Sequence, residues 1–369
     1  MTHIGIGVIG WGFMGRAHTF AIKTMPLHYA LDFEPRLVGV CSRRLEKAEE
    51  AARENGFEYA TDDYHKLLSD PDIDVVSICT PNDLHERMAL DAIAAGKNVY
   101  IDKPLSINGE SARRIADAAR ERGVYAQMAL NNRCFPATMM AHDLVTSGKL
   151  GRPTSFTCEY LHSGSVDPNR PIGWKQSADA VGGGVLLDLG SHALDLMIWM
   201  LGEVDKISCL TQTLYADRPT AGGGRTSALG EDRALMMLQF KNGAVGSVDA
   251  SKIATGTDDE LNFNIYLTGG AVRYSSLTGD YLDVYDVASG MGGFTRVHCG
   301  GRYPEPGGSF VPAKNSVGWI RSHVHSYYNF LDSIAHGRAC SPSLDEGAYL
   351  QEIMDKAYLS SQRGGSFEA

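Results

Sequence analysis

The first 130 residues alternate short apolar runs with longer helix-forming stretches, and this alternation limits the possible folds more than any other feature. Five runs, at residues 4–9, 37–41, 75–79, 98–101 and 124–130, are short, continuous and rich in β-branched residues. Helical periodicity covers residues 45–55, 85–95 and 109–122, and a glycine follows each of these stretches. Strands that are apolar on both faces and joined by helices predict a doubly wound parallel sheet in an α/β domain over residues 1–130.

The chain after residue 133 follows a different pattern. Strand-like segments occur at residues 155–161, 206–214, 234–240, 244–250 and 262–267, and helices are expected at 138–147, 323–336 and 348–360. The dipeptide Asn242-Gly243 between two of the strands is a strong hairpin signal. We therefore expect an α+β domain over residues 131–369, built on a large, mostly antiparallel sheet. Residues 290–312 are rich in Gly and Pro and predict a long mobile loop.

Composition excludes several classes of function. The formal net charge is -10 and the Lys and Arg residues are scattered, which argues against a protein that binds nucleic acid or an anionic membrane over a broad surface. No apolar run approaches the roughly 18 residues needed to span a bilayer, and no secretory leader is evident. The seven cysteines are widely spaced and form no C-x-x-C pair, so we expect reduced thiols in a cytoplasmic, unexported protein.

A glycine-rich turn lies between the first expected strand and the first expected helix. Gly10-Trp11-Gly12-Phe13-Met14-Gly15 is a complete G-x-G-x-x-G. In this context the first glycine permits the tight turn, the second lets the backbone approach a pyrophosphate, and the third lets helix pack against strand. The turn predicts a Rossmann fold in which Gly10, Gly12, Phe13, Met14 and Gly15 bind a dinucleotide; a merely flexible turn is the alternative.

The end of the second expected strand indicates which dinucleotide is bound. NAD-binding folds usually place a carboxylate there to accept a hydrogen bond from the ribose 2′-hydroxyl, whereas this strand ends Cys41-Ser42-Arg43-Arg44. A hydroxyl and two guanidinium groups suit a 2′-phosphate. We predict a preference for NADP(H) with NAD(H) possible; exposed arginines that only aid solubility are the alternative.

Two further segments, residues 80–85 and 96–104, follow the third and fourth expected strands. Open α/β sheets bind ligands at the carboxyl ends of their strands, so Lys103 could project toward a nicotinamide ring. A lysine before a proline, taken alone, is more often a surface residue.

Residues 182–202 predict a helix that is apolar on nearly all sides and is bracketed by glycines. Its polar exceptions Asp188, His192 and Asp195 fall at i, i+4 and i+7, in one row that carries no Lys, Arg or Glu. Such a row is expected to be buried and to need polar partners. Three interpretations stay open from spacing alone: a catalytic histidine oriented by a carboxylate, a satisfied core histidine, or a metal ligand.

Taken together, five linked motifs resemble the glucose-fructose oxidoreductase and inositol dehydrogenase family over essentially the whole chain. They are G-x-G-x-x-G at residues 10–15, T-P-N-x-x-H at 80–85, G-K-x-V-x-x-E-K-P at 96–104, N-x-R-F-x-P-A at 131–137, and G-G-G-x-L-x-D-x-G-x-H-x-x-D at 182–195. Two positions depart from the family pattern. Asp102 stands where the family has glutamate, and Cys134 stands where it has phenylalanine.

The resemblance implies a set of site residues. Lys103, Asp188 and His192 would be catalytic, and Thr80, Asn82, His85 and Asp102 would lie near the cofactor together with Lys103. The substrate-binding residues would be the catalytic three with Asn131, Arg133, Trp174 and Lys175, and Tyr160 is added from its position. The resemblance also implies a cis Lys103-Pro104 bond, an open-faced C-terminal sheet used for homodimers or homotetramers, and a pocket between the domains for a polyhydroxylated substrate. We expect no metal.

The predicted function is hydride transfer between NADP(H) or NAD(H) and a secondary ring hydroxyl or ketone of a sugar, anhydrosugar or cyclitol. His192 would accept the hydroxyl proton, Asp188 would orient the imidazolium, and Lys103 would polarise the same oxygen. The residues leave open whether Lys103 or His192 moves the proton first. Two rivals are a redox-neutral sugar hydrolase or lyase working through a transient 3-keto intermediate, and a non-catalytic redox sensor.

Overall fold

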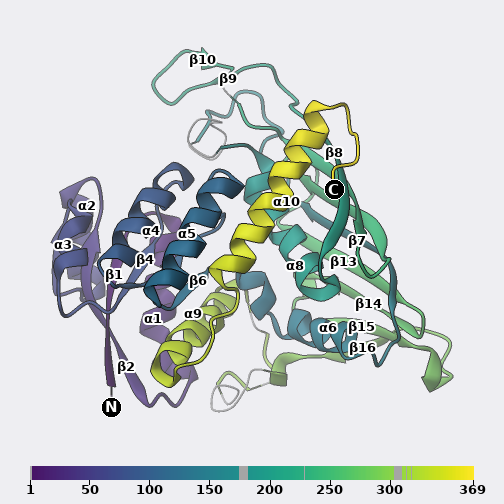
Figure 1. Cartoon of the computed structure of the whole chain (residues 1–369), viewed down its shortest axis with the longest axis horizontal. Helices are drawn as coiled ribbons and strands as arrows, with labels where there is room; N and C mark the ends of the chain where they lie inside the picture. Colours follow the sequence, from purple (N-terminus) through teal and green to yellow (C-terminus); the bar gives the residue numbers. More distant parts are fainter. Residues whose placement is uncertain (1, 174–181, 228, 303–309, 313, 317) are drawn as a thin grey trace. The chain divides into compact units, whose positions relative to one another are not determined.

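The computed structural model describes residues 2–173, 182–227, 229–302, 310–312, 314–316 and 318–369, which form two compact units (Figure 1). The N-terminal unit consists of residues 1–134, 303–312 and 318–349, and the C-terminal unit of residues 135–302, 313–317 and 350–369. The sequence led us to expect one division at residue 130, and the structure differs because the chain returns to the N-terminal unit. There helix α9 (Trp319–His336) packs against helix α1 (Phe13–His28), and Tyr328 stacks on Tyr29 at 3.8 Å between ring centroids.

The N-terminal unit is built on a six-stranded parallel sheet with strand order β3-β2-β1-β4-β5-β6. The strands are β1 (Thr2–Ile9), β2 (Phe33–Cys41), β3 (Tyr59–Thr61), β4 (Val75–Ile78), β5 (Asn98–Ile101) and β6 (Ala126–Met128). The other helices are α2 (Leu45–Asn55), α3 (Tyr64–Ser69), α4 (His85–Ala94) and α5 (Gly109–Arg122), of which α4 and α5 pack side by side. The doubly wound sheet is therefore confirmed. Strand order reverses at β1, between β2 and β4, and this reversal is where such sheets bind ligands.

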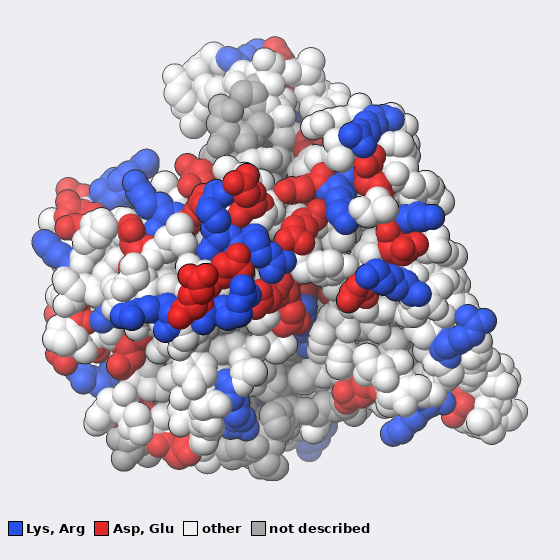
Figure 2. All heavy atoms as spheres, in the orientation of Figure 1, with Lys and Arg blue, Asp and Glu red and all other residues white. Residues whose placement is uncertain are grey.

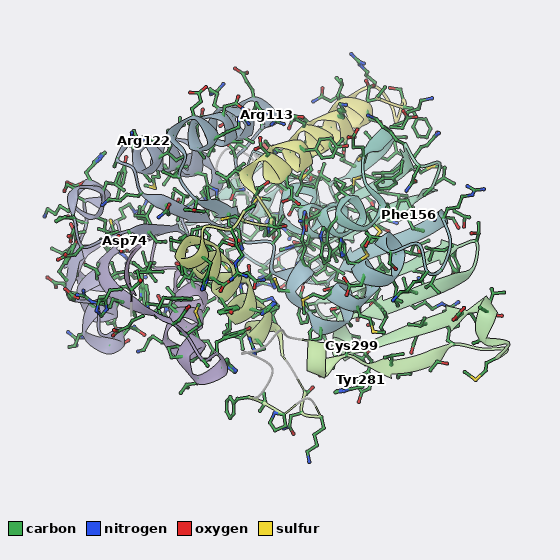
Figure 3. The ribbon with its side chains drawn as sticks, turned by 60° about the horizontal axis from the view of Figure 1, so that its bottom comes forward. Asp74, Arg113, Arg122, Phe156, Tyr281 and Cys299 are labelled. Carbon is green, nitrogen blue, oxygen red and sulfur yellow. The ribbon has the colours of Figure 1, made fainter. Side chains whose placement is uncertain are left out.

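Close backbone packing joins two of these strands, and capping residues set the ends of helix α5. Gly5 in β1 lies so close to the chain before β4 that a Cβ there would be 1.7 Å from the carbonyl oxygen of Asp72. The Gly5 amide donates to the carboxylate of Asp74 at 2.7 Å, which joins the two segments (Figure 3). Helix α5 is capped by the Asn108 side chain, which accepts from the Ser111 amide, and it ends at Gly123 with φ of 72°.

The C-terminal unit contains an eight-stranded sheet with order β16-β15-β14-β13-β7-β12-β11-β8. Its strands are β7 (Pro153–Leu161), β8 (Val204–Gln212), β11 (Arg233–Phe240), β12 (Val245–Ser251), β13 (Glu260–Leu267), β14 (Gly270–Ser275), β15 (Tyr281–Asp286) and β16 (Thr295–His298). Only β7 and β12 pair in parallel among these strands, so the expected mostly antiparallel sheet is confirmed. Gly243, with φ of +90°, makes the expected turn between β11 and β12.

The sequence analysis missed β14, β15 and β16. Strand β16 corrects the first part of the loop expected at residues 290–312, of which residues 303–309 lie outside the described part of the chain. Strand β16 forms because it pairs with β15, where Arg296 makes two hydrogen bonds to the Asp283 carboxylate. His298 also packs its ring against Tyr281 on β15 at 5.0 Å. These contacts come from a partner strand, and the four residues of β16, which are flanked by glycines, show none of them.

One face of the C-terminal sheet is covered by helices. These are α6 (Pro136–Thr146), the π-helix η4 (Leu186–Gly190) and α8 (Ser191–Leu201). Phe156 of β7 lies in this core against Phe240 of β11, whereas Tyr281 of β15 is exposed (Figure 3). A small hairpin of β9 (Arg218–Pro219) and β10 (Arg225–Thr226) lies outside the sheet. Helix α10 (Leu344–Gln362) begins in the N-terminal unit and ends in the C-terminal unit.

The surface agrees with the charge analysis. On the face drawn in Figure 2, basic and acidic side chains are interspersed. Many of them form ion pairs, such as Arg114 with Glu86 and Glu110 on helices α4 and α5. No helix in the described part of the chain is both long and apolar enough to cross a membrane.

Candidate active site

The glycine turn of the N-terminal unit has the geometry of an anion-binding loop. Gly10 has φ of +101°, and a Cβ there would be 2.6 Å from the Cys79 carbonyl oxygen; a Cβ on Gly15 would be 2.1 Å from the Gly10 carbonyl oxygen. A Cβ on Gly12 would meet nothing within 4 Å. Helix α1 starts at Phe13 with no side-chain cap and no acidic residue in its first turn. The start of the helix therefore has no side-chain cap and open space beside Gly12, as a pyrophosphate site requires.

Two further observations fit a nicotinamide dinucleotide at this edge of the sheet. The Thr80 hydroxyl, directly after β4, is buried without a hydrogen-bond partner among the described residues, and a bound ligand could satisfy it. Phe13 is 72% exposed and stacks on Trp319 of α9, itself 38% exposed, at 5.5 Å. The sequence analysis missed Trp319, because nothing in the sequence places α9 beside the glycine turn.

The predicted nucleotide-discriminating residues follow β2. The Ser42 amide donates to Thr61 of β3 at 3.1 Å, which fixes the start of the segment. Arg43 and Arg44 are exposed, and neither pairs with a carboxylate among the residues described. Arg44 is the last extended residue before α2.

His85 ties together the two turns that follow β4 and β5. Its Nδ1 is 2.9 Å from the Pro104 carbonyl oxygen, and its Nε2 is 2.9 Å from the Thr80 carbonyl oxygen. The ring is fully buried, which lowers its pKa. The place of His85 near the cofactor stays a prediction; its ring joins the turn after β4, at Thr80, to the turn after β5, next to Lys103. The Asp102 carboxylate accepts from the Lys103 amide at 2.9 Å, and Lys103-Pro104 is cis, as the family resemblance implied.

Three other predicted residues of this unit are buried. Asn82 begins a short 3₁₀ turn before α4. Asn131 donates to the Ser322 hydroxyl of α9 at 2.9 Å, and the Arg133 guanidinium lies 2.5 Å from a Glu346 carboxylate oxygen at the start of α10. These contacts hold the chain after β6 in place.

In the C-terminal unit, the segment around Asp188 begins at the Gly182–Gly184 run. Gly184 is buried so tightly that a Cβ would be 2.3 Å from the Glu231 backbone. This close approach lets the Glu231 carboxylate accept hydrogen bonds from the Leu186 amide and the Tyr358 hydroxyl, both at 2.9 Å. Burial raises the pKa of Glu231. Glu231, distant in sequence, thus caps this helical segment.

The predicted row of polar residues is buried as expected, but its helix is not regular. Asp188 lies in the π-helix η4, and the α-helix begins only at Ser191, so the simple i, i+4, i+7 spacing needs correction. Asp188, His192 and Asp195 are all buried. Tyr160 of β7 packs its ring 5.9 Å from the His192 ring, so the structure brings these two predicted residues together.

The structure adds a residue that sequence reasoning missed. The Lys252 Nζ lies 3.0 Å from an Asp188 carboxylate oxygen, and the two side chains are 4% and 10% exposed. The available signal was the expected burial of Asp188, which demands a partner, but nothing in the sequence shows which cation supplies it. In the described ranges, no three His, Cys, Asp or Glu side chains are grouped as a metal site. Trp174 and Lys175 lie outside the described residues.

Comparison with known proteins places the chain in a family. Residues 4–130 match the model of an oxidoreductase family with an NAD-binding Rossmann fold, and residues 138–273 match the GFO/IDH/MocA C-terminal domain. Levoglucosan dehydrogenase of Pseudarthrobacter phenanthrenivorans is 33% identical over 98% of this chain and 96% of its own. The chain belongs to the GFO/IDH/MocA family. It is an oxidoreductase, and the predicted family and fold are confirmed.

Two more relatives are informative. Myo-inositol 2-dehydrogenase of Thermotoga maritima is 27% identical over 69% of this chain and 71% of its own. A solved complex of levoglucosan dehydrogenase with NADH and levoglucosan is 32% identical over 99% of this chain and 98% of its own, with a TM-score of 0.95. Both names describe dehydrogenases of cyclic polyhydroxylated compounds.

Proposed function

We propose that this oxidoreductase transfers hydride between a nicotinamide cofactor and a secondary ring hydroxyl of an anhydrosugar or a related sugar or cyclitol. The observation that carries the proposal is the buried group formed by Asp188, His192, Tyr160 and Lys252 in the C-terminal unit. A histidine that only fills the core does not need several buried ionisable groups around it, whereas an acid–base site does. The named relatives supply the substrate class.

Three residues have separate roles in the proposed reaction. The nicotinamide, when bound, supplies the hydride acceptor. His192 accepts the hydroxyl proton, Asp188 orients the imidazole and stabilises its charged form, and Lys103 donates a hydrogen bond to the same oxygen. Asp102 and His85 hold the turn that carries Lys103 through the contacts described above. Thr80 and Asn82 contribute to the cofactor side, and Asn131, Arg133, Trp174 and Lys175 to the substrate side.

Absorbance at 340 nm tests this proposal. Purified protein is assayed against a panel of anhydrosugars, sugars and inositols with NADP and with NAD. We expect steady formation of reduced cofactor with at least one cyclic substrate. Co-purifying nicotinamide with no net reduction would instead support the redox-neutral alternative, and cofactor binding without any turnover would support a redox sensor.

We also propose that NADP(H) is preferred, with Ser42, Arg43 and Arg44 around the 2′-phosphate. The exposed guanidinium groups at the end of β2 and the lack of a carboxylate there support this. In the double variant Arg43→Ala/Arg44→Ala, the KM for NADP is expected to rise about 10–100-fold because two charge-assisted contacts are lost. The KM for NAD should change little, and Arg53→Ala, an exposed arginine at the end of α2, is the matched control. A wild-type protein that strongly prefers NAD would contradict the proposal.

The uncovered face of the C-terminal sheet supports a homodimer or homotetramer. Leu210, Leu235, Met237 and Val245 are exposed on the neighbouring strands β8, β11 and β12. Exposed apolar groups clustered in this way mark association surfaces. Met237→Glu is expected to lower the mass measured by sedimentation, whereas Leu27→Glu, at an exposed apolar position of α1 in the N-terminal unit, should leave it unchanged. An unchanged mass in Met237→Glu, or a monomeric wild type, would contradict this assignment.

We also propose a cytoplasmic location. None of the seven cysteines forms a disulfide in the described structure, and five of them are buried. Thiols that form no disulfide suit a reducing compartment.

A further inference from the structure

Lys252 lies directly after β12, and its position is fixed by the backbone. Its amide donates to the Asp232 carbonyl oxygen at 2.8 Å, and its carbonyl oxygen accepts from the Ser165 amide at 2.8 Å. These bonds anchor the residue at the end of the strand. From there its side chain runs inward and places Nζ 3.0 Å from the Asp188 carboxylate.

Stability does not explain this buried pair. Removing two charges from water costs about as much as their mutual attraction returns, so an apolar pair of similar volume would serve the core as well. Asp188 nevertheless has to be a carboxylate if it is to support a protonated His192. The Lys252 ammonium group, 3.0 Å away, gives the buried Asp188 carboxylate a fixed opposite charge.

We propose that Lys252 is a positioning residue for the reaction, whose ammonium group holds the Asp188 carboxylate ionised and in place, four residues before His192 in the same helical segment. This inference rests on the proposed function, because it gives Asp188 a role in the proton transfer. Lys252 acts through Asp188 and is distinct from Lys103, which belongs to the N-terminal unit.

The other charged and titratable groups near the pair come from every element packed around η4. They are Tyr160 from β7, Glu231 and Asp232 ahead of β11, and His192 and Asp195 from α8. The nearby acids have partners of their own. Asp232 lies 3.7 Å from the Arg218 guanidinium, and Glu231 is held by Leu186 and Tyr358. Asp188 is the carboxylate in direct contact with the Lys252 ammonium, whose charge also acts on Glu231.

The direction of the pH effect follows from the charges. With Lys252 in place, the pair carries no net charge, and His192 can stay neutral as a base. Without the ammonium group, either the Asp188 carboxyl binds a proton at higher pH, or its unbalanced charge raises the pKa of His192. An opposite charge at this distance shifts a carboxyl pKa by about 1–3 units, and both outcomes move the acidic limb of the kcat–pH profile upward.

The test compares Lys252→Met with Lys252→Arg in the full chain. In Lys252→Met the acidic limb should move up by at least about one pH unit, so that kcat on its acidic side falls about tenfold for each unit. Lys252→Arg should restore most of the limb position, because it keeps the charge. Lys206→Met, an exposed lysine of β8, is the matched control. In an Asp188→Asn background, Lys252→Met should have little further effect.

A second measurement does not depend on turnover. The pKa of His192 is read by NMR of protein labelled at histidine Cε1, with the resonance assigned by His192→Gln. For Lys252→Met we expect one of two results. Either the pKa of His192 rises, because the charge of Asp188 is no longer balanced, or Asp188→Asn no longer changes that pKa, because the Asp188 carboxyl already carries a proton. An unshifted limb or a uniform loss of kcat, together with an unchanged His192 titration, would overturn the proposal. If the wild type turns over no substrate, the proposed function fails, and the NMR titration still decides whether Lys252 controls Asp188.

Discussion

Replacing His192 by alanine is expected to lower kcat for ring-hydroxyl oxidation about 10²–10⁴-fold, because the oxidation loses its proton acceptor. Affinity for the cofactor should stay the same, since the glycine turn lies in the other compact unit. The measurement is steady-state turnover at 340 nm on the substrate found in the panel, with cofactor binding followed by fluorescence.

A histidine on the same unit provides the control. His298 is exposed on β16, where its ring packs against Tyr281, and His298→Ala should retain wild-type turnover. Lys103→Ala should also lose most of its turnover, through loss of the hydrogen bond that polarises the reacting oxygen. Near-normal turnover in both His192→Ala and Lys103→Ala would show that the assignment of the catalytic residues is wrong.

The second large effect is expected at the glycine turn, where alanine substitutions at two glycines should have different consequences, one for cofactor binding and one for stability. Gly12 has φ of -104° and open space where a Cβ would be, so alanine fits the fold there. The added methyl group would occupy the space through which a pyrophosphate approaches the first amides of α1. Gly12→Ala should therefore keep the wild-type Tm and weaken cofactor binding on the order of a hundredfold.

Gly10→Ala is the matched contrast. Its φ of +101° disfavours alanine by about 1–3 kcal/mol, and the methyl group would also collide with the Cys79 carbonyl oxygen at 2.6 Å. This variant should unfold at a Tm lower by several degrees, measured by calorimetry with and without cofactor. Wild-type cofactor affinity in Gly12→Ala would contradict a pyrophosphate at this turn, and an unchanged Tm in Gly10→Ala would contradict the described backbone.

Much of the N-terminal unit could be predicted, because its signals are local. Helices α2 and α5 begin and end at the expected residues. Their periodicity lies within each helix, and the Asn108 cap and the closing glycines lie directly beside it. The short strand β3 and helix α3 escaped prediction, because segments of three and six residues carry too little periodicity. Strand β16 escaped because its stability comes from pairing with β15.

The candidate site divides in the same way. Spacing and resemblance picked out Asp188 and His192, and the structure confirms that both are buried. The regular helix expected around them was wrong: Leu186–Gly190 form a π-turn, which begins at the residue whose amide donates to Glu231. Glu231 and Tyr358 were not predicted, since only the folded chain brings them to Gly184.

The sequence by itself determined the doubly wound N-terminal sheet, the dinucleotide turn and the burial of the Asp188 row, because backbone conformation and hydrophobic periodicity are properties of neighbouring residues. Only the tertiary structure decided that α9 returns to the N-terminal unit, that Trp319 stacks on Phe13, and that Lys252 pairs with Asp188. A lysine in a sequence is expected at the surface, and its charge becomes part of a site only when folding removes it from water and sets a carboxylate beside it.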